Sequence, residues 1–327
     1  MKYQFTSVLS SEMNSYLALL RQAGRYIDKM QSSLKSFDYY LNEHNHKDKE
    51  IKEEVVSSWL STKQVKIRTK AGILYNLKGF ARYFSSLGFK AIIPEIPIIK
   101  IDYVPYVFSK DEFMQMVSVA DNFGWGKRRQ SRAPKVFPVL LRILYSCGLR
   151  LGEGLSLRWT DIDLETGVIT IHNGKNIKQR LVPMSNSLTE ILLLYKEKMQ
   201  FENVCRDYLF ESSYMHGKPY SHDTFSLWFS QILKQSEILY SRQTPHERGP
   251  CPHCLRHTFV LYSFLKSENE GRKFEDTSAF LSAFLGHNSP KETDKYLTVS
   301  HTVYTESHRR VNAYIENLFP EIDFDED

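Results

Sequence analysis

Residues 91–105, AIIPEIPIIKIDYVP, divide the chain because they hold three prolines and show no helical period. Proline fixes its own backbone and pushes the preceding residue towards extended conformations, so a regular helix is not expected through this segment. At 327 residues the chain is long enough for two domains. We therefore expect a helical domain over 1–103, which includes most of this proline-rich linker, and a second domain over 104–327.

The distribution of apolar residues predicts the elements on either side of the linker. Helical spacing runs through residues 11–87, which indicates a helical N-terminal domain. In the second domain, Ser109 is a candidate N-cap followed by acidic residues, and 137–146 forms an apolar helical stretch. Two strand-like segments, 168–172 and 180–184, flank an Asn-Gly pair typical of a hairpin. The expected fold is mainly α with a small antiparallel β-sheet.

Positive charge is concentrated at the end of the N-terminal domain. From residue 63 to residue 90 there are seven basic residues and no acidic one, and 127–135 contains five more without an acid. Segregated positive charge is expected of a protein that binds nucleic acid, although a solvated helix face is the simpler explanation of any single run. The candidate DNA-binding residues are Lys63, Lys66, Arg68, Lys70, Lys78 and Arg82.

Five short segments of the second domain contain residues that could carry out chemistry on a phosphate, and their order along the chain is informative. They are YSCGLRLGEGLSLRWTDID (145–163), NGKNIKQRLVP (173–183), HCLRHTF (253–259), LGH (285–287) and KYLTVS (295–300). In this order they resemble the first arginine box, the lysine hairpin, the His-x-x-Arg box, the second histidine box and the nucleophile box of tyrosine recombinases. The tyrosine also follows the second histidine by nine residues, the spacing of that family.

The resemblance implies an enzyme that cleaves and rejoins DNA through a 3′-phosphotyrosyl intermediate. Arginine suits the negative charge on a phosphate undergoing substitution, because its planar fork donates two parallel hydrogen bonds. A tyrosine hydroxyl, with a pKa of about 10, needs help to lose its proton near neutrality. No metal ion or cofactor is expected. The implied roles are Arg150 and Arg256 as phosphate clamp, Lys175 as general acid, His253 as helper of the nucleophile, His287 as phosphate ligand and Tyr296 as nucleophile.

Some of these assignments have rivals. Lys178 and Arg180 share the hairpin with Lys175, and a shift of one residue in register changes which side chain points inward. Lys175 is favoured because it follows the turn glycine, as the family's lysine does. Tyr304 is a second candidate nucleophile, but its distance from the second histidine departs from the family spacing.

Two further features depart from the family pattern or suggest another site. Cys251, His253 and Cys254, with His246 nearby, resemble half of a zinc site, but structural zinc usually needs two such pairs. The polar stretch 266–276, KSENEGRKFED, predicts an extended loop between the third and fourth motifs.

The expected partner is double-stranded DNA, bound by a homotetramer on paired sites, with accessory DNA-bending proteins as further candidates. No stretch approaches the roughly 18 apolar residues that span a bilayer, and the first residues lack a signal peptide's pattern, so a cytoplasmic, nucleoid-associated protein is expected. A type IB topoisomerase shares the chemistry, and a catalytically silent DNA-binding relative shares the fold. The separate basic domain favours the recombinase over the topoisomerase, and the intact residue set argues against the silent relative.

Overall fold

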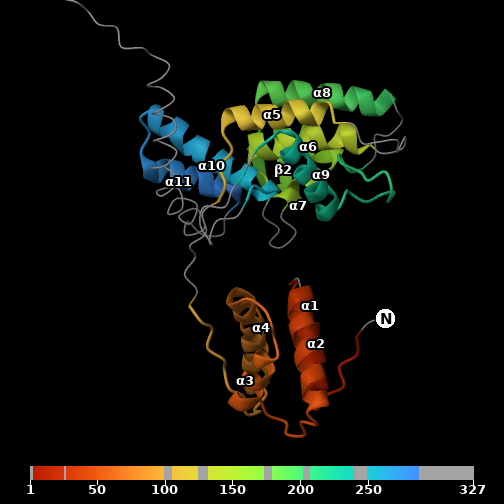
Figure 1. The fold of residues 1–327 in the computed structure, drawn as a ribbon, viewed down its shortest axis with the longest axis vertical. Coiled ribbons are helices and arrows are strands. Elements are labelled where there is room, and N and C mark those ends of the chain that lie inside the picture. The colour runs from red at the N-terminus through yellow and green to blue at the C-terminus, as the bar shows by residue number, and fades with distance from the viewer. Residues whose placement is uncertain are drawn as a thin grey trace, which may run out of the picture. The chain divides into compact units, whose positions relative to one another are not determined.

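The computed structural model describes residues 3–25, 27–98, 105–123, 132–172, 179–201, 207–238, 240 and 249–286. The chain forms two compact units, Met1–Ile101 and Asp102–Asp327 (Figure 1). Among the described helices, none combines the length and the apolar surface that crossing a bilayer requires.

The first unit is built from helices packed around α4. Its helices are α1 (Ser10–Gln22), α2 (Asp28–Glu43), α3 (Glu53–Ser61) and α4 (Ile67–Ser86). Both α1 and α2 pack against α4, and the buried side chains include Phe37, Trp59 and Phe80. The rings of Phe37 and Trp59 lie 4.9 Å apart between centroids. The predicted helical character of the N-terminal domain is confirmed.

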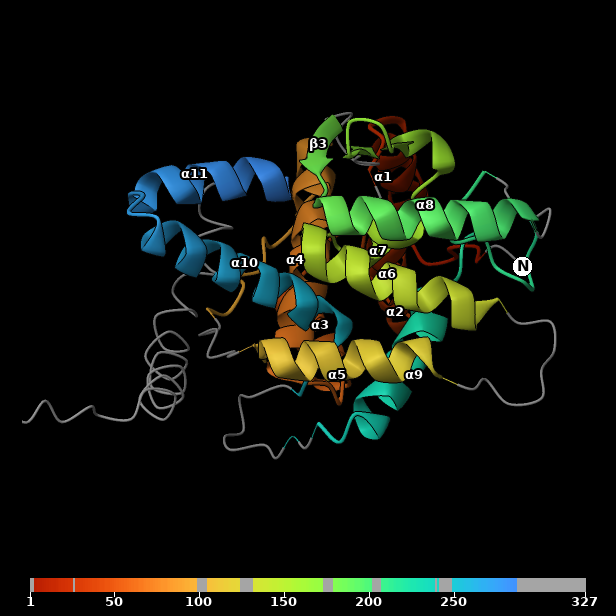
Figure 2. The ribbon, with the colours of Figure 1, turned by 90° about the horizontal axis from the view of Figure 1, so that it is seen from above.

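The second unit is mainly helical and is organised around α6. Its helices are α5 (Lys110–Asp121), α6 (Ala133–Cys147), α7 (Leu151–Leu155), α8 (Asn186–Phe201), α9 (His222–Gln235), α10 (Pro252–Asn269) and α11 (Phe274–Leu285), with a 3₁₀ turn, η1, at Trp159–Asp161. Helix α6 lies between α5 and α8 (Figure 2) and also contacts α10. Ser109 is the N-cap of α5, as predicted, and its hydroxyl accepts a hydrogen bond from the backbone N–H of Glu112.

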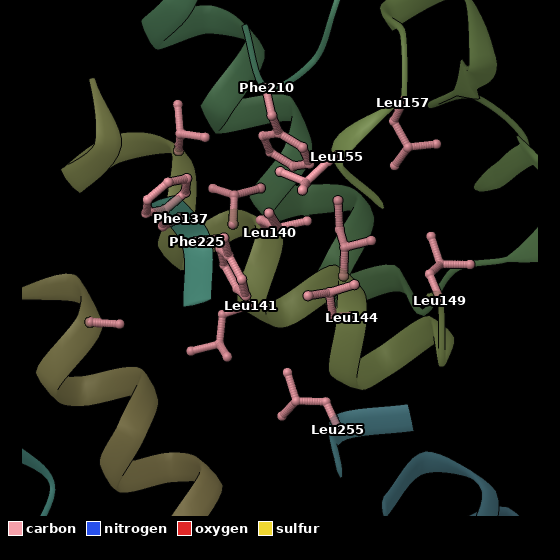
Figure 3. Packing of buried hydrophobic residues seen from close by; sticks show 14 of the residues in the cluster. Phe137, Leu140, Leu141, Leu144, Leu149, Leu155, Leu157, Phe210, Phe225 and Leu255 are labelled. Carbon is pink, nitrogen blue, oxygen red and sulfur yellow. The ribbon is translucent and has the colours of Figure 1, made fainter. Parts of the chain in front are cut away.

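Helix α6 is central because nearly every face of it is apolar. Phe137, Leu140, Leu141 and Leu144 are buried along its length, and Figure 3 shows them meeting side chains from several other segments, among them Leu255 of α10. Burial of such side chains stabilises a fold by about 1.5–3 kcal/mol each. This packing fixes α6, and with it the turn that follows α6 at the candidate site.

The strands form one small antiparallel sheet in the order β1-β2-β3. Their bounds are β1 (Ile162–Asp163), β2 (Val168–His172) and β3 (Gln179–Pro183). The register pairs Ile169 with Val182 and His172 with Gln179. The predicted hairpin and the predicted mainly α fold with a small antiparallel sheet are therefore confirmed, while the turn at 173–178 lies outside the described residues.

The prediction of an extended loop over residues 266–276 is wrong. Helix α10 continues to Asn269 and α11 begins at Phe274, so four residues connect the two helices. The hydroxyls of Ser267 and Thr277 are 2.5 Å apart and hold the helix ends together. The polar composition of this stretch suggested a loop. It instead reflects the solvent-exposed ends of two helices.

Candidate functional site

Arg150 stands directly before α7 and lines a cleft. Helix α6 ends at Gly148, whose backbone is left-handed with φ 58°. A Cβ at Gly148 would lie 2.4 Å from the ring of Phe259, so both the conformation and the contact require glycine. This turn presents Arg150 at the cleft, where 39% of its side chain is exposed. The guanidinium is therefore accessible to a phosphate.

Arg256, on α10, is fully buried. Its Nη1 donates to the carbonyl of Gly148 at 2.8 Å, and its Nη2 donates to the carbonyl of Leu285 at 2.9 Å. Arg256 thus ties the end of α6 to the end of α11. The sequence predicts two arginines acting together on one phosphate, whereas in this structure Arg150 is open to the cleft and Arg256 binds two backbone carbonyls.

The carboxylate of Glu153 interacts with three arginines of the site. Its carboxylate accepts from the backbone N–H of Arg150 at 2.9 Å and from the Arg150 Nη1 at 2.8 Å. Arg180 of β3 donates from Nη1 at 3.2 Å and from Nη2 at 2.8 Å, and the Nη1 of Arg256 lies 3.9 Å away. A buried carboxylate with this many donors stabilises three positive charges that would otherwise repel one another. Glu153 therefore holds the site together.

The arginines also set the ionisation of Glu153. Burial by itself would raise the pKa of this carboxyl, but the hydrogen bonds and charge of Arg180, with the hydrogen bonds from Arg150, outweigh burial and lower the pKa to about 2. A carboxyl with a lowered pKa adds stability that is complete above its unfolded pKa and is lost as the pH falls through its folded pKa. The contribution amounts to about 3 kcal/mol.

We expect Glu153→Gln to lower the free energy of unfolding at neutral pH and to remove part of the acid sensitivity. The difference between the two proteins should shrink as the pH falls from about 4.5 to about 2, because the wild-type carboxylate becomes protonated over that range. Urea unfolding at a series of pH values measures this difference. Glu190→Gln, on the exposed surface of α8, should give a constant small difference. A Glu153→Gln difference independent of pH would contradict the ion-pair role.

His253 lies at the start of α10 and is open to the cleft. Partial burial of the ring and the positive charges of Arg256 and Arg150 lower the pKa of His253 to about 4. His253 is therefore neutral at physiological pH in the protein without DNA, the form that accepts a proton. The ring of His257 packs edge-on against it, with centroids 4.8 Å apart.

The cleft combines polar groups from three helix starts. Arg150 and Glu153 come from the start of α7, His222 from the start of α9, and Cys251 and His253 from the start of α10. His222 packs against Gly152, where a Cβ would lie 3.0 Å from its Nε2. The remaining lining residues are Leu151, Gly152, Ser226 and Pro252. A cleft with an exposed arginine and two histidines is suited to an anionic ligand.

Hydrogen bonds fix the base of the β2–β3 hairpin. The Nε2 of His172 is 3.1 Å from Asp161, and the side-chain amide of Gln179 is 3.1 Å from the Nδ1 of His172. Since the Gln179 amide nitrogen donates, the Nε2 of His172 carries the proton and donates to Asp161. The chain of bonds clamps both residues that flank 173–178. Lys175 and Lys178, the candidate general acids, lie outside the described residues.

Arg180 does not compete with Lys175 for the general-acid role. Its side chain is 9% exposed and is held by Glu153 and by the carbonyl of Phe284, which accepts from Nε at 2.8 Å. An arginine also stays protonated in proteins, so it cannot give up a proton to a leaving group. Arg180 instead links β3 to the end of α11.

Helix α11 ends where the sequence predicts, at Gly286. The backbone there is left-handed with φ 64°, and a Cβ would lie 2.9 Å from the Nη1 of Arg180. The glycine therefore lets Arg180 approach the chain directly before the second histidine box. His287, Tyr296 and the rival Tyr304 lie outside the described residues.

The six candidate DNA-binding residues lie on and just before α4. Lys66, Arg68 and Arg82 are exposed, and Lys63, Lys70 and Lys78 are half-buried. In the described part of the chain, none of the six forms an ion pair. Arg68, Tyr75 and Arg82 are spaced seven apart, two helical turns each, so they share one face, and Tyr75 is 67% exposed. A basic face with an exposed aromatic ring is therefore presented to solvent.

Sequence reasoning missed the roles of Glu153, His222 and His257. The signal for Glu153 is its position three residues after Arg150, the spacing of neighbours on one helix face. No comparable signal marks His222, because only the packing of α9 against α7 brings it to the cleft. In the described part of the chain no three His, Cys, Asp or Glu side chains gather as a metal site. His246 of the zinc alternative lies outside that part.

The sequence and fold of the chain are similar to those of known recombinases and integrases. The model of the phage integrase family matches residues 107–302. Tyrosine recombinase XerC of Staphylococcus carnosus (strain TM300) is 24% identical over 306 residues, which cover 91% of each chain. The XerH site-specific recombinase bound to palindromic difH substrate, a post-cleavage complex, has a similar fold, with a TM-score of 0.61, 20% identity, and coverage of 83% of this chain and 75% of that one. A lambda integrase tetramer bound to a Holliday junction also has a TM-score of 0.61, at 16% identity, covering 89% and 78%.

Proposed function

The chain belongs to the phage integrase family, the tyrosine recombinases, and on this basis we propose that it cleaves and rejoins DNA strands through a 3′-phosphotyrosyl bond to Tyr296, without a metal ion. The observation that carries the proposal is the convergence of Arg150 and His253 on one cleft, with Glu153 holding Arg150 in place. All six candidate catalytic residues fall within the matched range 107–302. Formation of a covalent protein–DNA adduct on duplexes that carry the target site is the direct test.

Arg150 is proposed to bind the scissile phosphate through its exposed guanidinium. A fixed cation beside the phosphate stabilises the charge that builds on the non-bridging oxygens, and removing one such donor costs about 3–4 kcal/mol of barrier. Arg256 acts from within the fold, because its guanidinium holds the carbonyls of Gly148 and Leu285. Since Arg256 is fully buried, its contact with the phosphate would require a rearrangement that exposes the guanidinium.

His253 is proposed to take the proton from Tyr296. Its pKa of about 4 leaves the ring neutral in the protein without DNA. A bound phosphate adds negative charge next to Arg150 and His253, which offsets the two guanidiniums and raises the pKa of His253 towards its ordinary value. Binding of DNA would therefore make the His253 ring a stronger base.

Lys175 is proposed as the general acid that protonates the departing 5′-oxygen. We expect Lys175→Ala to block cleavage of ordinary DNA and to recover most of the cleavage rate when sulfur replaces that oxygen, because a thiolate leaves without a proton. Single-turnover cleavage of paired oxygen and sulfur substrates measures the rescue. Lys178→Ala is the matched control, and rescue of that variant instead would transfer the role to Lys178.

We propose that the basic face of α4 and the second unit both contact the duplex, with the proline-rich segment 91–105 as the connection. The exposed side chains of Arg68 and Arg82 have no carboxylate partner among the described residues, so their charge is available to phosphates. The active form is proposed to be a homotetramer on paired sites. Support comes from the fold shared with a lambda integrase that forms a tetramer on a Holliday junction.

The double variant Arg68→Gln/Arg82→Gln is expected to bind DNA more weakly and with a flatter dependence on salt. Each phosphate contact contributes a slope of about −0.9 to a plot of log K against log salt, so losing two contacts lowers the slope by about two. Affinity measured from low to moderate salt checks this. Arg21→Gln/Arg25→Gln, at the end of α1 and just beyond it, is the control. If the affinity and the salt slope of the α4 variant were unchanged, Arg68 and Arg82 would not contact DNA, and this face would be ordinary solvated surface.

A further inference from the structure

Two cysteines meet at the start of α10, beside the candidate site. Cys251 is the N-cap of the helix, and Pro252, His253 and Cys254 form its first turn. The two sulfur atoms are 3.5 Å apart, and the amide of Cys254 donates to the carbonyl of Cys251 at 2.8 Å. The sequence Cys-Pro-His-Cys thus places two thiols in direct contact within a single tight turn.

The two thiols differ in their access to solvent. Cys251 is half-buried and lines the cleft together with Arg150 and His253. Cys254 is fully buried in the core of the unit. A reagent in the cleft can therefore reach the first sulfur but not the second, an arrangement suited to one attacking thiol and one resolving thiol.

We propose that Cys251 and Cys254 are a site of reversible oxidation that closes to a disulfide across the first turn of α10. A disulfide bond is about 2.05 Å long, so the sulfurs need to approach by about 1.5 Å from their 3.5 Å contact. Side-chain rotation within one turn can supply that movement. Cys147, the other described cysteine, is buried within α6 and has no such neighbour among the described residues.

The oxidant is a small-molecule disulfide such as glutathione disulfide. The Cys251 thiolate attacks one sulfur of the oxidant, forms a mixed disulfide and releases one glutathione thiolate. The Cys254 thiolate then attacks the Cys251 sulfur and releases the second glutathione, so two protein thiols and one disulfide become one protein disulfide and two thiols. The contact with Cys251 and burial raise the pKa of Cys254, while the 3.5 Å distance between the sulfurs favours the second, intramolecular step.

The bond would act on the site through His253. The closed ring contains Cys251, Pro252, His253 and Cys254, so the disulfide would restrain the backbone that presents the His253 ring to the cleft. Arg256 follows two residues later on the same helix. This second part rests on the proposed function: we expect the oxidised protein to form less covalent adduct with DNA than the reduced protein.

Mass spectrometry of the full-length chain tests the disulfide itself. After treatment with glutathione disulfide, tryptic peptide 249–256, which contains both cysteines, should be lighter by about 2 Da, the mass of the two hydrogens lost, and dithiothreitol should reverse the change. Cys251→Ser is the matched variant, because serine is a good N-cap and preserves the start of the helix. That variant should show no such loss.

Two results would overturn the proposal: a peptide that stays fully reduced, or one that carries glutathione without closing the ring. A separate arm measures covalent adduct with DNA in reduced and oxidised protein. Adduct that is equal in both, while the disulfide forms, removes the link to His253 but leaves the disulfide site. Absence of adduct even in the reduced protein counts against the proposed function and not against the cysteine pair. Cys251→Ser should give the same yield in both buffers.

Discussion

Replacing Tyr296 with phenylalanine is expected to abolish the covalent protein–DNA adduct while leaving DNA binding largely intact. The substitution removes one oxygen, the atom that would attack the phosphorus, and keeps the aromatic ring. A nicked duplex whose cleaved fragment diffuses away traps the intermediate, so a denaturing gel separates protein joined to DNA from protein that only binds. Binding is measured on the same duplex by gel shift, which shows that the variant is folded.

Tyr304→Phe is the matched control for Tyr296→Phe. It removes the same atom from a tyrosine eight residues further on, outside the spacing from His287 that identifies the nucleophile. We expect this variant to form the adduct at a normal level. An adduct that survives in Tyr296→Phe and disappears in Tyr304→Phe would move the nucleophile to Tyr304.

Replacing Arg150 with lysine is expected to slow strand cleavage by about 10²–10³-fold while weakening DNA binding much less. Lysine keeps the positive charge, but it loses the planar fork that can hold a phosphate and Glu153 together. Arg256→Lys should slow cleavage to a similar degree and should also lower the melting temperature. A lysine cannot hold the carbonyls of Gly148 and Leu285 in the geometry of the guanidinium.

Single-turnover cleavage, equilibrium binding and thermal unfolding separate these effects. Arg142→Lys serves as control, because Arg142 makes a two-point pair with Asp121 at 2.8 Å and 2.6 Å away from the cleft, and a surface pair of this kind contributes about 0–1 kcal/mol. It should leave cleavage unchanged. If Arg150→Lys reduced binding and cleavage in equal measure, Arg150 would grip DNA without stabilising the reacting phosphate.

The sequence alone was sufficient for features that depend on neighbouring residues. The hairpin follows from two alternating strand segments around an Asn-Gly pair, the start of α5 from Ser109, and the end of α11 from Gly286. Each of these three features is determined by the backbone preferences of a few neighbouring residues, which can be recognised in a short stretch of sequence. The order and spacing of the five motifs likewise identified the family before any contact was known. The stretch 266–276 misled because polarity alone does not distinguish a loop from the exposed face of two helices.

Tertiary structure alone decided how the candidate site is assembled. Glu153 binds Arg150, three residues away, and Arg180, 27 residues away, while Arg256 bonds to Gly148 and Leu285 from distant parts of the chain. Apart from the three-residue spacing of Arg150 and Glu153, no local pattern contains such pairings, because the packing of α6, α10, α11 and β3 brings the segments together. Burial also sets the contacts of Arg256, a predicted phosphate ligand, because its guanidinium donates to backbone carbonyls at the ends of two helices in the protein without DNA. The residue types were readable in the sequence, but their partners and their exposure depend on the folded core.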